Sequence, residues 1–364
     1  MKHINEYRDP QLAQAIVLNI KAHSKKPIRL MEVCGTHTMS IFRHGIRTLL
    51  PDTLTLLSGP GCPVCVTSQN DIDAFIALAR IKDVIITTFG DLMRVPGTTS
   101  SLQIERAEGK DIRVVYSATD ALNIAKANPS KHIIFLGVGF ETTAPTIAAS
   151  LLMAQEAGVK NYYVFSAHKV VPPALDALMQ TDGIRIDGFI LPGHVSVIIG
   201  TSAYRSFFER FQIPCVIAGF EPADLLQAIN TLVRQTDAGV PELVNAYSRA
   251  VGAEGNFKAK NIMNQVFRPV DTTWRGIGRI AQSGLKIKEA FASLDAEKRF
   301  EIPIFNHQEP MGCACGEILT GMKIPPQCPL YKKRCTPASP VGACMVSSEG
   351  TCAAYYRYAD QSLD

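Results

Sequence analysis

Residues 28–37 read IRLMEVCGTH, an apolar run rich in branched side chains that ends in a cysteine, a glycine and a histidine. The same plan recurs to about residue 220: a short apolar run, a loop rich in Gly, Pro or Thr, and then a helical stretch. Successive runs begin roughly 20–30 residues apart, which is the period of a β-α-β unit. Continuous apolar runs of this kind are typical of parallel strands that are covered on both faces.

The chain is therefore predicted to be an α/β protein. Strands are expected at residues 28–33, 53–57, 84–88, 112–116, 132–136, 162–165, 188–191 and 215–218. Helices are expected at residues 71–80, 119–127, 144–157, 173–180 and 221–234. Eight such strands can close one barrel or form open sheets. We favour two Rossmann-like open parallel-sheet domains plus a cysteine-rich iron–sulfur domain.

Three domains are expected along the chain. The first α/β domain takes residues 28–130 and the second takes residues 131–250, with the break at the Asn-Pro-Ser of residues 128–130. Beyond residue 250 the strand-like runs stop, and the chain becomes rich in Pro, Gly and Cys. Residues 251–364 have too little apolar content for a core of their own, so we expect them to order around a metal centre, together with residues 1–27.

Composition narrows the class of function. The 364 residues carry a net charge of +4, which is too balanced for a protein that binds nucleic acid or an anionic membrane. No signal peptide is recognisable, and no apolar stretch reaches the ~20 residues that a membrane helix needs. A cytoplasmic location is expected, where thiols stay reduced. Ten cysteines in such a chain favour metal or redox chemistry over structural disulfides.

The unusual loops each follow the carboxyl end of an expected strand, the edge at which α/β proteins bind ligands. They are CGTHT at 34–38, GPGCPVC at 59–65, FGDLMRVPG at 89–97, GVGFETT at 137–143, AHK at 167–169 and PGHVS at 192–196. We expect these loops to converge on one cleft. Four of their side chains are candidate acid–base or supporting groups, although each alone is more often structural: Asp91, Glu141, His168 and His194.

Three cysteines in these loops are candidate ligands or redox groups. Cys62 and Cys65 form a CxxC pair before an expected helix, whose N-terminus stabilises the thiolate that binds metal or exchanges disulfides. Redox chemistry or iron ligation is favoured over half of a zinc site, because no second pair lies nearby. Cys34 is either a buried packing residue or a thiolate that His37 orients, and a cysteine-hydrolase site stays open. Cys215 is expected to be a packing residue.

Six of the ten cysteines lie near the C-terminus. Four of them follow the spacing C-x14-C-x6-C-x16-C: Cys313, Cys328, Cys335 and Cys352. Four thiolates are the ligands of a [4Fe–4S] cluster, whereas structural zinc sites usually draw on two close CxxC pairs, so the spacing favours a cluster. Cys315 and Cys344 are left over, and as a disulfide they could accept electrons from the cluster.

Several stretches occur together and in order: MEVCGTH at 31–37, GPGCPVC at 59–65, GFETT at 139–143, PGHVS at 192–196, and in the tail CPL at 328–330, CMVS at 344–347 and AYYRY at 354–358. Over nearly the whole chain this pattern resembles the HypD family of [NiFe]-hydrogenase maturation factors. Met39 departs from the pattern, since some members carry a histidine there, and no ligand role is assigned to it.

The resemblance implies a redox-active assembly scaffold instead of a conventional turnover enzyme. Such a protein pairs with the small chaperone HypC and holds an iron that becomes an Fe(CN)2CO group. HypE delivers the cyanide as a thiocyanate, and the complex then serves the hydrogenase large subunit. The resemblance also implies two similar α/β domains and a third that bears a [4Fe–4S] cluster.

Site residues are implied in the same way. Cys34, with Cys62 and Cys65, is expected to bind the iron, and the latter two also form a redox pair. His37, Glu141 and His194 are expected to assist at the cleft. The cluster ligands are expected to be Cys313, Cys328, Cys335 and Cys352, and the electron-relay pair Cys315 and Cys344. Two alternatives remain: a cluster-dependent disulfide reductase resembling ferredoxin–thioredoxin reductase, and a structural zinc protein.

Overall fold

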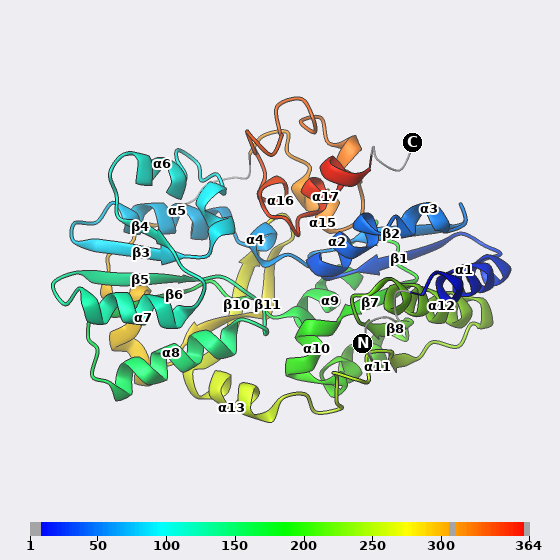
Figure 1. Ribbon diagram of the computed structural model, residues 1–364, viewed down its shortest axis with the longest axis horizontal. Helices are drawn as coiled ribbons and strands as arrows, with labels where there is room; N and C mark the ends of the chain where they lie inside the picture. The colour runs from blue at the N-terminus through cyan, green and yellow to red at the C-terminus, as the bar shows by residue number, and fades with distance from the viewer. Residues whose placement is uncertain (1–8, 306–309, 360–364) are drawn as a thin grey trace.

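The computed structural model describes residues 9–305 and 310–359 as an α/β fold with two open parallel sheets (Figure 1). One sheet has the strand order β2-β1-β7-β8-β9 and the other has the order β4-β3-β5-β6. The strand bounds are β1 Ile28–Glu32, β2 Leu54–Ser58, β3 Val84–Thr88, β4 Ile112–Val114, β5 His132–Gly137, β6 Tyr162–Ser166, β7 Gly188–Pro192, β8 Cys215–Ala218 and β9 Leu243–Asn245. The predicted fold class is confirmed, and the described strands form open sheets instead of a barrel.

The helices lie between the strands and on both faces of the sheets, as the sequence predicts (Figure 1). Their bounds are α1 Pro10–His23, α2 Gly35–Arg43, α3 Ile46–Leu49, α4 Pro63–Val66, α5 Gln69–Ala79, η2 Gly90–Arg94, α6 Leu102–Ala107, α7 Ala118–Ala127, α8 Ala144–Glu156, α9 Val171–Met179, α10 Gly193–Ile199, η3 Thr201–Tyr204, α11 Arg205–Phe211, α12 Pro222–Ala238, α13 Phe257–Val266, η4 Glu289–Leu294, α14 Ala296–Arg299, α15 Cys315–Leu319, η5 Pro325–Gln327, α16 Ala343–Val346 and α17 Thr351–Tyr358. None of these described helices combines the length and hydropathy of a membrane span.

The two sheets are interleaved along the chain. β3 and β5 pair directly, with Ile86 opposite Ile134, so the boundary predicted at residue 130 falls inside the second sheet. β1 and β2 belong instead with β7, β8 and β9. The chain therefore crosses to the second sheet after β2 and returns after β6. Sequence did not reveal this because every β-α-β unit has the same apolar pattern, whichever sheet it joins.

A hairpin lies beyond residue 250, where no strand was expected. β10 (Phe267–Trp274) and β11 (Gly278–Ile287) pair antiparallel, and most residues of β10 are at least partly exposed. A one-sided strand of this kind lacks the continuous apolar run by which the other strands were found. The hairpin braces both crossings between the sheets, through bridges from Trp274 to Thr67 and from Gly284 to Lys169.

Residues 1–27 were expected to order with the cysteine-rich domain, but the described part of this segment forms helix α1, which packs on the first sheet. Ile16, Val17 and Ile20 of α1 are buried in one cluster with residues of β1, β2, β8 and α12. In the described part of the chain, α1 thus covers the first sheet and does not join the cysteine-rich region. That region, residues 310–359, packs its short helices α16 and α17 against α4 and α2 (Figure 1).

The α1 contact can be tested with two substitutions in one helix. Ile20 is fully buried and Leu18 is 62% exposed. Ile20→Ala leaves a cavity under the first sheet and is expected to lower the free energy of unfolding by about 2–5 kcal/mol in urea denaturation. Leu18→Ala is expected to change it by less than about 0.5 kcal/mol. Equal effects of the two substitutions would contradict this placement of α1.

Candidate functional site

The loop after β1 places Cys34 against the CxxC loop. Cys34 is the N-terminal cap of α2, and the Gly35 N–H donates a hydrogen bond to the Gly61 carbonyl at 2.9 Å. A Cβ on Gly61 would lie 2.2 Å from the backbone nitrogen of Cys34, so only glycine allows this approach. Because β1 and β2 are adjacent parallel strands, their loops leave the sheet at the same edge.

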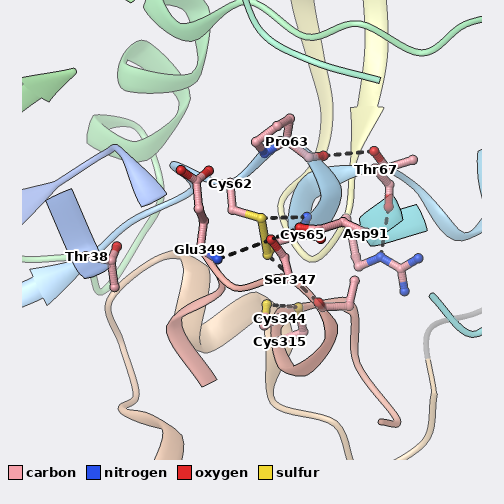
Figure 2. The surroundings of a disulfide bond; sticks show 12 residues. Thr38, Cys62, Pro63, Cys65, Thr67, Asp91, Cys315, Cys344, Ser347 and Glu349 are labelled. Atoms are coloured by element: carbon pink, nitrogen blue, oxygen red, sulfur yellow. Dashed lines mark hydrogen bonds between the residues drawn. A yellow bond between two sulfur atoms is a disulfide. The ribbon is translucent and has the colours of Figure 1, made fainter. Parts of the chain in front are cut away.

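Cys62 and Cys65 form a disulfide in the structure (Figure 2). Cys62 caps the short helix α4, and the Cys65 N–H donates to Cys62 Sγ at 3.2 Å. Both residues are buried, with Cα atoms 5.2 Å apart. A disulfide offers no thiolate to a metal, so this pair must be reduced before it can join Cys34 as a ligand.

Burial governs the chemistry of Cys34. It raises the pKa of the thiol to about 12, and the nearby carboxylates of Glu349 and Glu32 act in the same direction. Backbone N–H groups of His37 and Thr36 point at the sulfur and oppose this rise. The thiol therefore stays protonated at neutral pH unless a cation compensates its charge, and a metal ion does so directly.

Sequence reasoning missed Glu32, whose carboxylate is hydrogen-bonded to the backbone of Cys34. Its carboxylate accepts hydrogen bonds from the Cys34 N–H at 3.0 Å and from the Thr38 hydroxyl at 2.5 Å. Burial raises the pKa of Glu32 to about 7, although hydrogen bonds from Thr38, Ser58 and Cys34 oppose this. A carboxylate at the end of an otherwise apolar strand was the signal that could have revealed it.

The C-terminal region contacts the Cys34 loop through Glu349. The Thr36 hydroxyl donates to Glu349 Oε1 at 2.7 Å, and a Cβ on Gly35 would lie 2.5 Å from Glu349 Cβ. Further along, the Ser347 hydroxyl donates to Asp91 Oδ2 at 2.9 Å. Asp91, a candidate acid–base residue, thus anchors the C-terminal segment to the second sheet in this structure.

All six C-terminal cysteines line one small cavity, namely Cys313, Cys315, Cys328, Cys335, Cys344 and Cys352. The other lining residues are Ile318, Tyr331, Gly342 and Met345, and no carboxylate or imidazole is among them. In the part of the chain that the structure describes, no group of three or more His, Cys, Asp or Glu side chains is preformed for a metal ion, so neither a zinc site nor a cluster site is already assembled. An all-thiol, apolar cavity fits the donor set of a [4Fe–4S] cluster.

Cys315 and Cys344 stand apart as a pair within this cavity. Their sulfurs are 3.2 Å apart and are not bonded (Figure 2). The residue before Cys344 is Ala343, whose carbonyl lies 4.0 Å from Cys65 Sγ. The disulfide of the CxxC loop thus contacts the segment that carries Cys344, one member of this second cysteine pair.

The structure does not bring His37 or His194 to the Cys34 sulfur through their rings. His37 is buried, with Nε2 3.2 Å from the Ala218 carbonyl, and burial lowers its pKa to about 4. His194 is exposed and stacks on Phe220 at 3.8 Å, and His37 contacts the same ring at 4.9 Å. The two histidines thus share an aromatic stack at the end of β8.

Glu141 and His168 lie at the crossing that leads back to the first sheet. Glu141 Oε1 accepts from the Val171 N–H at 2.9 Å, whereas its buried Oε2 has no partner in the described residues. Burial raises the pKa of Glu141 to about 7. His168 Nδ1 is 2.9 Å from the Ser166 hydroxyl, and burial lowers its pKa to about 3. Both residues thus make hydrogen bonds to the segment that leads from β6 back to the first sheet.

Comparison with known proteins shows the family to which the chain belongs. A family model described as "HypD: Hydrogenase formation hypA family" matches residues 11–359. The chain belongs to the HypD family. It is 45% identical to hydrogenase maturation factor HypD2 of Bradyrhizobium diazoefficiens, over 98% of this chain and 97% of the relative. It is also 45% identical to hydrogenase maturation factor HypD of Azotobacter vinelandii, over 99% of this chain and 98% of the relative.

The hydrogenase maturation factor HypD of Cupriavidus necator is 44% identical, over 98% of this chain and 97% of that protein. The HypD family match over residues 11–359 includes the Cys34 loop, the CxxC loop and the C-terminal cysteines.

The close approach of the Cys34 loop and the CxxC loop predicts that Gly61 does not tolerate a larger side chain. Gly61→Ala is expected to push the CxxC loop away from Cys34, because its Cβ would meet the Cys34 backbone. Faster alkylation of the Cys34 thiol, followed by mass spectrometry of the reduced protein, would report the opening. Gly252→Ala is the control, since a Cβ there meets nothing within 4 Å. Equal alkylation rates in both variants would show that the contact does not shield Cys34.

Glu141 predicts a specific pH dependence of stability. Its folded-state pKa of about 7 lies above the ordinary 4.5, so its contribution to stability is present at low pH and is lost as pH rises through 7. Glu141→Gln should remove this loss. The variant's stability relative to the unmodified protein should rise by roughly 2–3 kcal/mol between pH 5 and pH 8 in urea denaturation. The exposed Glu156→Gln is the control, and parallel pH profiles for all three proteins would refute the assignment.

Proposed function

We propose that this member of the HypD family is a scaffold for the active-site iron of [NiFe]-hydrogenases. On this account it pairs with HypC, holds an iron that acquires two cyanides and a carbonyl, and receives the cyanide from HypE. The assembled Fe(CN)2CO group then passes to the hydrogenase large subunit. The iron is cargo, and the C-terminal cavity is the place for a resident [4Fe–4S] cluster.

One observation carries this proposal: three groups of sulfur side chains adjoin one another through backbone contacts. Cys34 meets the CxxC loop at Gly61, and Cys65 meets the cysteine cavity at the Ala343 carbonyl. Soft thiolates suit low-spin iron that also binds cyanide and carbonyl. An iron bound at Cys34 would also supply the positive charge that the buried thiolate lacks.

The chemistry of cyanide transfer requires the adjoining thiols. Release of cyanide from a thiocyanate sulfur takes up two electrons, and two thiols can supply them by forming a disulfide. One thiocyanate and the two thiols of Cys62 and Cys65 would thus give one thiol, one disulfide and hydrogen cyanide. The disulfide seen between Cys62 and Cys65 is the expected product of that step.

Return of the CxxC pair to thiols can use the second pair. Cys315 and Cys344 are close enough to form a disulfide as they reduce Cys62–Cys65, so that atoms and electrons balance within the chain. A cluster held by Cys313, Cys328, Cys335 and Cys352 would supply electrons one at a time to restore the relay. This chemistry needs reduced thiols, which favours a cytoplasmic location.

The same row of neighbouring cysteines also favours a second candidate function. This is a cluster-dependent disulfide reductase that resembles ferredoxin–thioredoxin reductase. Such an enzyme would use the CxxC disulfide and the cysteine cavity, but its substrate would be a protein disulfide. It would bind no iron beyond the cluster. Iron binding at Cys34 therefore separates the two functions.

Cys34→Ala tests the scaffold directly. After anaerobic copurification with HypC, the variant is expected to lose the iron that is additional to the cluster, while its labile sulfide and cluster absorbance stay unchanged. Cys215→Ala is the matched control, because Cys215 is also a buried cysteine but lies inside β8. If the Cys34 variant retains as much iron as the Cys215 variant, Cys34 is not a ligand of the additional iron.

A further inference from the structure

A tight turn just before Cys335, one of the proposed cluster ligands, forms part of the wall of the cysteine cavity. The Leu330 carbonyl accepts hydrogen bonds from the backbone N–H groups of Arg334 and Cys335, at 3.1 and 2.9 Å. Tyr331 and Cys335 make an isolated β-bridge, and both line the cavity. Because backbone bonds hold this turn, the side chains between Tyr331 and Cys335 are not needed to fold it.

The turn presents three consecutive cations to solvent, Lys332, Lys333 and Arg334. The residues on either side of them, Tyr331 and Cys335, are buried and line the cavity, so the three charges lie on the outer side of its wall. Lys332 Nζ is 5.8 Å from the centroid of the Tyr331 ring. Neither Lys333 nor Arg334 makes an ion pair with a described residue, so their charge is available to a partner.

An exposed apolar side chain adjoins these cations. Met311 is 98% exposed. Gly312 follows it and lies against the turn, because a Cβ on Gly312 would be 3.8 Å from Leu330 Cδ2. The Gly312 carbonyl is also 4.0 Å from the sulfur of Cys328, another proposed cluster ligand. Apolar and basic side chains thus cover the same part of the cavity wall, a combination that suits a small interface with a charged partner.

The proposed relay consumes electrons that must come from outside the chain. Reduction of one disulfide to two thiols takes two electrons and two protons, and an iron–sulfur cluster passes electrons singly. A one-electron carrier must therefore approach the cavity from the solvent side. Arg334 precedes Cys335 directly, so a carrier bound at these cations would lie beside the cluster.

We propose that the turn of residues 330–335, together with Met311, is the docking surface for an acidic one-electron carrier protein of the ferredoxin type. The inference rests on the cluster proposed for the cavity. The reduced carrier loses one electron and the cluster gains it; two such transfers, with two protons from solvent, restore one pair of thiols. The cations attract an acidic carrier over about a Debye length, and the small contact lets the oxidised carrier leave.

Binding to charge-reversed variants tests this surface. The full-length protein is purified anaerobically, its labile sulfide is counted, and it is titrated in a calorimeter with an oxidised plant-type [2Fe–2S] ferredoxin at an ionic strength of about 0.01 M. The double variant Lys333→Glu/Arg334→Glu is expected to raise the Kd at least about tenfold. Lys25→Glu/Lys26→Glu is the matched control, because these two cations are also adjacent and exposed but lie between α1 and β1, and it should stay within about twofold.

Electron transfer gives a second measurement on the same proteins. In stopped-flow mixing with reduced ferredoxin, Lys333→Glu/Arg334→Glu is expected to slow reduction of the cluster roughly tenfold at low ionic strength. The difference should vanish at about 1 M salt, where the Debye length is about 3 Å, and this shows that the clusters react equally. Met311→Ser should weaken ferredoxin binding at both ionic strengths, since salt does not screen an apolar contact.

The outcomes separate this proposal from the proposed function. A protein without labile sulfide would contradict the cluster and the docking surface together. With the cluster present, the docking surface alone is wrong if the two double variants bind ferredoxin equally. It is also wrong if a basic cytochrome c loses as much affinity as ferredoxin does for the Lys333→Glu/Arg334→Glu variant.

Discussion

The structure depends on the backbone contact between Gly61 and the Cys34 loop. Adjacent parallel strands deliver the two loops to one edge of the first sheet, but a side chain at residue 61 would keep them apart. Because residue 61 is glycine, Cys34 and the CxxC pair are neighbours. The C-terminal region packs on both of these loops. Glu349 then packs on Gly35, and Ala343 reaches Cys65.

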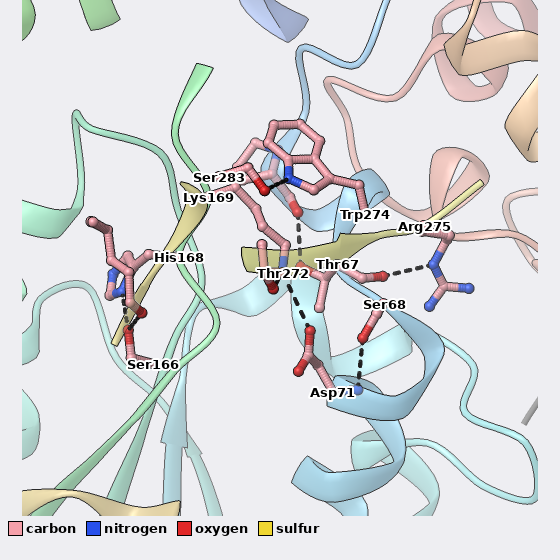
Figure 3. Close-up of polar contacts among 12 residues, drawn as sticks. Thr67, Ser68, Asp71, Ser166, His168, Lys169, Thr272, Trp274, Arg275 and Ser283 are labelled. Atoms are coloured by element: carbon pink, nitrogen blue, oxygen red, sulfur yellow. Dashed lines mark hydrogen bonds and ion pairs between the residues drawn. The ribbon is translucent and has the colours of Figure 1, made fainter. Parts of the chain in front are cut away.

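The interleaved sheets explain why so many parts meet at this place. The chain crosses from the first sheet to the second through the CxxC loop, and it returns near His168 and Glu141. The β10–β11 hairpin contacts both crossings, and its Arg275 donates a hydrogen bond to the Thr67 carbonyl, just after the CxxC pair (Figure 3).

Sequence predicted much of this fold because buried parallel strands have a strong local signal. The eight apolar runs and the loops after them could be located, and so could the cysteines that line the cavity. The pairing between strands could not be predicted from sequence. Ile86 and Ile134 are neighbours in the sheet, but an apolar residue in a buried strand does not specify which strand lies beside it. The hairpin was missed because β10 is one-sided, and α1 was misplaced because an amphipathic helix does not specify the surface that it covers.

The candidate site shows the same limit at the level of single residues. Cysteine spacing suggested which side chains belong together, but the burial of Glu32 beside Cys34 is not recorded in any local pattern. Similarly, His37 looked like a partner of the Cys34 thiol, yet its ring bonds to the Ala218 carbonyl on a distant strand. Long-range packing decided each of these roles.

The most direct test of the central claim is anaerobic purification with HypC, followed by counts of iron, zinc and labile sulfide and by infrared spectroscopy. The scaffold account predicts about four sulfides per chain, one iron beyond those of the cluster, and bands from iron-bound cyanide and carbonyl. Zinc without sulfide, or cluster iron without those bands, would contradict it.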